Sequence, residues 1–143
     1  VSTAADDIIA RPGNAGRRLA AAWEKLYGIK PDYSEAYSQA IKAVEDAVLP
    51  VVTPNDKVWT LGKAITVLEN QKWTLNLAKS SEKAPPSEVL VKMLRMLWVG
   101  EPDRHGGNTE GTEATFEESV LAVSIAVAVV NMFSVEGLAY KPE

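Results

Sequence analysis

Apolar residues recur every three or four positions along most of this chain, a spacing that places them on one face of an α-helix. The first helix is predicted between Asn14, whose side chain suits an N-cap, and Gly28, which suits a C-terminal stop. The second is predicted after Asp32, where Glu35 follows three residues later in the arrangement of a capping box.

Prolines and a glycine set the limits of the next elements. The second helix should end at the residue before Pro50, because a proline cannot continue helical hydrogen bonds, and Pro54 predicts an extended or turning segment. A third helix is expected from about residues 58–60, and Gly62 within it indicates close contact with another helix. The core-facing residues expected from these three helices are Leu19, Trp23, Leu26, Tyr27, Tyr33, Tyr37, Ala40, Ile41, Val44, Val48, Leu61, Ile65 and Leu68.

Residues 69–80 carry a mixed pattern. Trp73, Leu75 and Leu77 alternate as in a strand, yet the neighbouring sequence offers no partner strand. A further turn or two of helix is therefore expected, followed by a connector over residues 80–86.

The last two predicted helices flank a polar connection. The fourth runs from Ser87 to Gly100 and has the cleanest amphipathic pattern in the chain. Thr115 and Glu118 make a capping box for the fifth. From Val120 to Phe133 that helix is apolar on nearly every face, which predicts burial all round, either by its own domain or by a partner.

These elements predict an all-α protein, a single up-and-down bundle of about five helices. Residues 1–13 are interpreted as a leader or linker, and residues 14–143 as a single helical domain. The tryptophans at positions 23, 59, 73 and 98 are spaced as core residues rather than as a platform for stacked bases.

Composition narrows the class of protein. The 143 residues are 46% hydrophobic and 24% charged, which is ordinary for a soluble domain. A net charge of -4 gives no global attraction for nucleic acid, so any such contact requires a local basic cluster. There is no cysteine. No signal peptide is recognised and the apolar run at 120–133 is too short for a membrane span, so a cytoplasmic protein without a membrane role is expected.

The candidate chemistry lies between Gly100 and Thr115, in a connection long enough to suggest a functional loop. It holds the only histidine, in the sequence Arg104-His105-Gly106-Gly107-Asn108. An imidazole can exchange a proton near neutral pH, and a guanidinium can hold a phosphate. The alternative is structural: His105 binds a helix end and the glycines turn the corner. Either way, the residues call for no cofactor or metal.

The chain from about Tyr33 to Phe133 resembles the C-terminal domain of bacterial abortive-infection proteins, a branch of the HEPN helical superfamily. The likeness rests on the helix Tyr37-Ser38-Gln39-Ala40-Ile41-Lys42-Ala43-Val44-Glu45, the segment Thr60-Leu61-Gly62-Lys63-Ala64-Ile65, the basic His-Gly loop and the Ala/Val-rich last helix, in that order.

That resemblance implies a helical bundle that often dimerises, so that two histidine-bearing loops form one cleft. It also implies a metal-independent ribonuclease in phage defence or a toxin, with His105 assisting attack of a ribose hydroxyl. The family's arginine has no match at its usual interval before His105. Arg104 or Arg95 would serve in its place, with Gly106, Gly107 and Asn108 near the substrate, or the domain has lost nuclease activity.

Two hypotheses follow. The first is a HEPN-like ribonuclease that binds RNA as a homodimer, with Arg104 and His105 as catalytic residues. The second is a non-catalytic interaction, dimerisation or ligand-sensing domain, in which the apolar last helix docks on a second copy or on a neighbouring domain of a longer chain.

Overall fold

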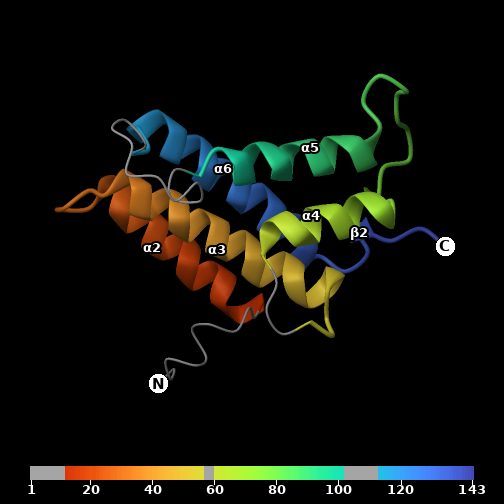
Figure 1. The fold of residues 1–143 in the computed structure, drawn as a ribbon, viewed down its shortest axis with the longest axis horizontal. Coiled ribbons are helices and arrows are strands. Elements are labelled where there is room, and N and C mark those ends of the chain that lie inside the picture. Colours follow the sequence, from red (N-terminus) through yellow and green to blue (C-terminus); the bar gives the residue numbers. More distant parts are fainter. Residues whose placement is uncertain (1–11, 57–59, 102–112) are drawn as a thin grey trace.

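The computed structural model describes residues 12–56, 60–101 and 113–143. These residues form five α-helices, preceded by a 3-10 turn and accompanied by one small antiparallel sheet (Figure 1). The predicted all-α bundle is confirmed. The elements are η1 (Pro12–Asn14), α2 (Ala15–Tyr27), α3 (Tyr33–Val52), α4 (Leu61–Asn70), β1 (Thr74–Leu75), α5 (Pro86–Val99), α6 (Phe116–Ser134) and β2 (Ala139–Tyr140).

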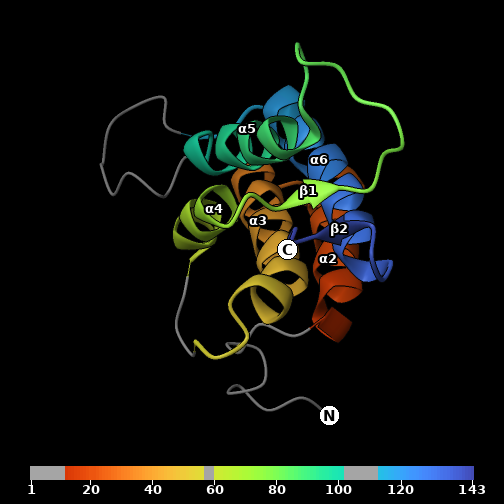
Figure 2. The ribbon, with the colours of Figure 1, turned by 90° about the vertical axis from the view of Figure 1, so that its right-hand side faces the viewer.

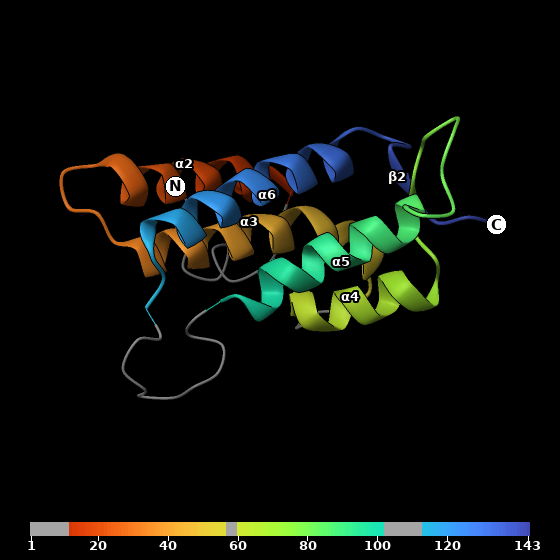
Figure 3. The same ribbon diagram turned by 90° about the horizontal axis from the view of Figure 1, so that it is seen from above.

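Helix α3 lies at the centre of the bundle. Seen from above, α2 and α6 lie along one side of it and α4 and α5 along the other (Figure 3). Small residues let α2, α4 and α6 approach its backbone closely, since Ala36, Ala40 and Ala43 have no exposed surface. Larger apolar residues such as Val44 and Val48 fill the spaces between the alanines and are also fully buried.

The limits of α3 show one correct and one wrong prediction. The helix begins as predicted, because the Asp32 carboxylate accepts a hydrogen bond from the Glu35 amide at 3.0 Å. It does not end before Pro50 but continues to Val52. Pro50 lies in the last turn, where the Thr53 amide still donates to the Leu49 carbonyl at 2.9 Å. Near a helix end, a proline removes one hydrogen bond without breaking the helix.

Helix α2 differs from its prediction in both its start and its buried face. Asn14 makes no capping hydrogen bond with the helix and has helical dihedral angles, because η1 leads directly into α2. Trp23, predicted in the core, is 60% exposed. The buried residues of α2 are Ala15, Ala22 and Leu26, and Leu19 packs against the core as predicted. Tyr27, also predicted in the core, is 50% exposed, so both large rings lie mainly outside the buried face.

Helix α4 starts opposite the middle of α3. The Glu45 carboxylate of α3 accepts a hydrogen bond from the Leu61 amide at 2.8 Å, and Thr60 caps the helix through the Lys63 amide. The predicted close contact at Gly62 is confirmed. A Cβ atom there would lie 2.8 Å from the indole nitrogen of Trp98 on α5, so only glycine lets the two helices meet at this point.

Residues 74–75 had been predicted to be helical, but they form the strand β1. This strand pairs antiparallel with β2, with Thr74 opposite Tyr140 and Leu75 opposite Ala139. Figure 2 shows the two strands side by side at one end of the bundle. The alternation of Trp73, Leu75 and Leu77 was therefore a strand pattern whose partner lies far away in the sequence.

Candidate functional site

The residues predicted to carry chemistry lie mostly outside the described residues. Arg104, His105, Gly106, Gly107 and Asn108 belong to residues 102–112. The structure does describe both flanks of this segment, and both are hydrogen-bonded to the first half of α3. The flanks set the surroundings in which any chemistry of Arg104 and His105 would occur.

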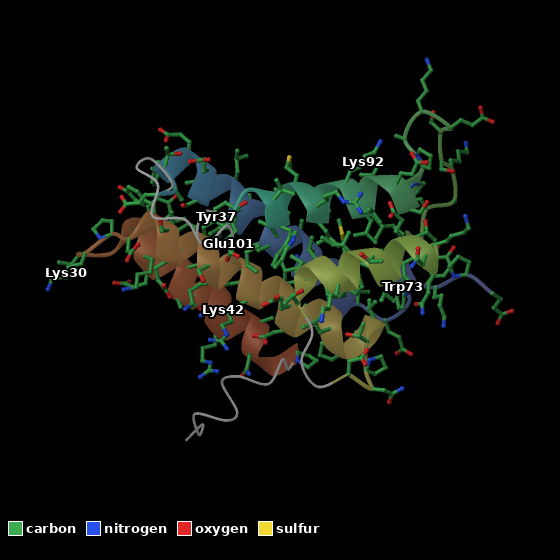
Figure 4. All side chains as sticks on the ribbon, viewed as in Figure 1. Lys30, Tyr37, Lys42, Trp73, Lys92 and Glu101 are labelled. Carbon is green, nitrogen blue, oxygen red and sulfur yellow. The ribbon has the colours of Figure 1, made fainter. Side chains whose placement is uncertain are left out.

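The first flank is the end of α5. The buried Tyr37 hydroxyl donates a hydrogen bond to the Leu97 carbonyl at 2.6 Å, and Gly100 packs directly against that hydroxyl. Burial, followed by the negative charges of Glu101 and Glu118, raises the pKa of Tyr37 to about 12. Tyr37 and Glu101 lie close together in Figure 4. The phenol is therefore a neutral donor that fixes the end of α5.

The second flank is the start of α6. The Ala114 amide donates to the Ser34 hydroxyl at 3.0 Å, and the Ser119 hydroxyl donates to the Tyr33 carbonyl at 2.6 Å. The predicted capping box is complete, with Thr115 and Glu118 exchanging hydrogen bonds of 2.9 and 3.1 Å. Helix α3 therefore holds both flanks in fixed positions.

A third carboxyl group lies in the same region. Glu45 projects from α3 toward the start of α4, and its pKa is raised to about 7. Burial is the main cause, and the charges of Glu101 and Asp46 add to it, while the Leu61 amide and Lys42 oppose it. A carboxyl group with a pKa near neutrality is a candidate proton donor or acceptor.

The sequence of this region is acidic as a whole. Residues 101–118 contain Glu101, Asp103, Glu110, Glu113, Glu117 and Glu118, against only Arg104 and His105 as basic side chains. A polyanion such as RNA meets repulsion from such a sequence. This balance of charge weighs against RNA as the ligand of the loop alone.

Arg95 is the one described residue among the predicted substrate-binding positions. Its guanidinium lies 3.5 Å from the Glu69 carboxylate of α4, and both side chains are about half exposed. It therefore faces α4 in the structure. Its proposed contact with substrate remains a prediction.

Helix α6 is only partly covered within the chain. Burial all round, either by its own domain or by a partner, was predicted, and within the described fold only Ser119, Ala122, Val123, Ala126 and Val129 are buried. Burial by a partner stays a prediction. Leu121 is 62% exposed and Val127 is 44% exposed. The 17 residues from Ser119 to Val135 include no charged side chain. Within residues 12–56, 60–101 and 113–143, the outer face of α6 is therefore apolar or weakly polar and open.

This open face continues onto α2 through aromatic rings. The ring centroids of Trp23 and Tyr27 are 4.5 Å apart, and those of Tyr27 and Phe116 are 5.8 Å apart. Helical geometry places Val120 and Val127 on the same side of α6 as Phe116. We call Trp23, Tyr27, Phe116, Val120 and Val127 the α2–α6 surface, and include in it Leu121, which lies about 140° from Phe116 on the exposed side of α6. This surface was not predicted from the sequence, because Trp23 has the spacing of a core residue and was expected to be buried.

The length of α6 also bears on the membrane prediction. Its 19 residues meet the length and composition of a membrane span, which the shorter run at 120–133 did not. Core helices of soluble proteins meet the same criteria.

No protein-family model, curated protein or solved structure matches this chain. Among the described residues, no group of three or more His, Cys, Asp or Glu side chains is placed to hold a metal ion. The HEPN-like resemblance therefore stays a prediction.

Proposed function

We propose that this chain is a helical interaction domain that forms a homodimer through the α2–α6 surface. The observation that carries this proposal is the open outer face of α6, which has no charged side chain between Glu118 and Glu136. An outward face of a helix normally carries charged and polar residues. On α6 the exposed positions instead alternate Leu121 and Val127 with the uncharged Ser124 and Asn131. An exposed helix face that carries large apolar residues and no charge is the kind of surface that binds a partner.

Charge and area favour a second copy of the chain as the partner. Each copy has a net charge of -4, and an uncharged face is where two such copies meet with the least repulsion. A helix with its side chains is about 10 Å wide and rises about 1.5 Å per residue. The 13 residues of α2 and 19 of α6 therefore present on the order of 500 Å² per copy. Two copies bury about 1,000 Å², near the lower limit of specific interfaces.

The test is the solution mass of matched variants, measured by sedimentation over a wide concentration range. Leu121→Asp and Val127→Asp should give folded monomers, because an ionised carboxylate cannot be buried unpaired at the interface. Leu77→Asp and Val89→Asp are the controls, since Leu77 is 61% and Val89 is 43% exposed outside the α2–α6 surface. They should leave the dimer intact. A wild-type monomer at every concentration, or equal loss in all four variants, contradicts the proposal.

The ribonuclease hypothesis is the second candidate, and the observation that favours it is the anchoring of both flanks on α3. Catalytic loops act from rigid supports, and α6 would bring two copies of the Arg104-His105 segment into one dimer. Purified wild-type protein, His105→Ala and the monomeric Leu121→Asp should be incubated with mixed RNA. Cleavage by the wild type alone supports this hypothesis. If the wild type and His105→Ala cleave equally, or if the wild type cleaves nothing, the ribonuclease hypothesis is wrong and the interaction domain remains as the proposed function.

A further inference from the structure

A groove runs between α5 and α4 with the turn that follows α4, away from the α2–α6 surface. Its volume is about 390 Å³, and its floor is formed by the buried side chains of Leu68 and Val91. The polar residues that line its walls are Glu69, Lys72, Ser87, Glu88, Lys92 and Arg95. The groove therefore combines an apolar floor with charged walls.

The charges in the groove favour an anion. Three cations, Lys72, Lys92 and Arg95, face two carboxylates, which leaves a positive balance on a chain whose net charge is -4. The cations come from both sides of the groove. The ion pair of Arg95 with Glu69 has a length of 3.5 Å and is half exposed, so a bound anion can compete for the guanidinium at little cost.

The backbone at Lys72 provides an independent observation. Its φ angle is 58°, the left-handed region, in the turn where the Trp73 amide donates to the Leu68 carbonyl at 3.0 Å. Glycine is the residue favoured at this position after a helix, and another residue costs about 1 kcal/mol there. The chain nevertheless has a lysine here, and its side chain lines the groove.

We propose that this groove binds a small molecule that carries a phosphate group. Lys72, Lys92 and Arg95 would hold the phosphate oxygens, while the apolar floor over Leu68 and Val91 would contact the rest of the molecule. The volume suits a ligand of about the size of a mononucleotide. Glu69 and Glu88 in the walls oppose a continuing chain of phosphates, which favours a small ligand over a nucleic acid.

Calorimetric titration of the full chain with AMP tests the proposal, with inorganic phosphate and a single-stranded RNA oligomer as parallel probes. Saturable binding of AMP is expected, and Lys72→Gly should weaken it about tenfold through the loss of one charge-assisted hydrogen bond. Because glycine relieves the backbone strain, Lys72→Gly should not lower the free energy of unfolding. A loss of binding therefore cannot be ascribed to misfolding.

Lys30→Ala is the matched control, since Lys30 is exposed and lies at one end of the molecule, well away from Lys92 (Figure 4). It removes the same charge and should leave AMP binding unchanged. The proposal is overturned if AMP binding is undetectable, or if both variants weaken it equally. It is also overturned if the protein binds RNA more tightly than AMP and Lys72→Gly abolishes the RNA binding. The dimer proposal is unaffected by any of these results, because it involves other helices.

Discussion

Helices α3 and α6 are both long and largely apolar, but the bundle covers them very differently. Eleven of the 20 residues of α3 are buried, against five of the 19 in α6. The more polar helix is nevertheless the better buried one. Helix α3 carries five charged or amide side chains, and one of them, Asp46, is itself buried and paired with Arg18 of α2 at 3.3 Å. The apolar character of a helix predicts that its surface is buried against something. How much of that surface is buried within one chain depends on the arrangement of the neighbouring helices.

The largest expected effect comes from placing the same charge on each helix. Val48→Asp puts a carboxylate at a position with no exposed surface, which should cost at least about 4 kcal/mol and unfold the domain. Val127→Asp should remain folded. Circular dichroism during urea titration measures both. If Val127→Asp unfolds as readily as Val48→Asp, the two helices are equally covered in the protein and the comparison fails.

A smaller, pH-dependent effect is expected at Glu45 on α3. Its pKa rises from 4.5 to about 7 on folding, so the folded state holds the proton more tightly than the unfolded state. The resulting stabilisation is complete below pH 4.5 and is lost as the pH rises through about 7. This change in pKa corresponds to about 3 kcal/mol.

Glu45→Gln isolates that effect, because an amide stays neutral at every pH. The variant should match the wild type near pH 4.5 and exceed its stability by up to about 3 kcal/mol at high pH. Urea titrations at a series of pH values give the difference. A constant difference between wild type and variant across the series rules out a raised pKa at this residue.

A more modest loss is expected when Tyr37 loses its hydroxyl. Tyr37→Phe leaves the buried Leu97 carbonyl without its 2.6 Å donor, which should lower the free energy of unfolding by about 1 to 2 kcal/mol. Tyr140→Phe is the control, since Tyr140 is exposed on β2. An equal effect in both variants would show that the hydrogen bond to α5 contributes nothing.

The smallest change in stability is expected on the outer face of α6. Leu121→Ser should change the free energy of unfolding by less than about 0.5 kcal/mol when measured on the dilute monomer. The same variant should still weaken the dimer measured by sedimentation. A large loss of stability in the monomer would mean that Leu121 is covered within its own chain.

Local features of the fold were predictable from the sequence. The capping box of Thr115 and Glu118, the end of α2 at Gly28 and the close approach at Gly62 all depend on residues next to them in sequence or on the size of a single side chain. The pairing of Leu75 with Ala139 joins residues 64 positions apart (139 minus 75). No local pattern specifies such a partner.

For the candidate site, too, local features were predictable from the sequence and contacts between distant residues were not. The sequence drew attention to Arg104 and His105, and these lie outside the described residues. It did not show that Tyr37 and Ser34 would hold the two flanks, because both contacts cross 60 or more residues. The apolar residues of α6 were also evident from the sequence, but the contact of Trp23 and Tyr27 on α2 with Phe116 on α6 was not.

The fixing of both flanks to α3 has a consequence for how this protein can diversify. When two points are held by the bundle, the entropy of closing the connection between them grows only with the logarithm of its length, about 0.6 kcal/mol for each doubling. Insertions or exchanges between Glu101 and Glu113 therefore leave the bundle nearly as stable as before. Residues in this connection can be selected for a new ligand or activity while the scaffold that supports them stays unchanged.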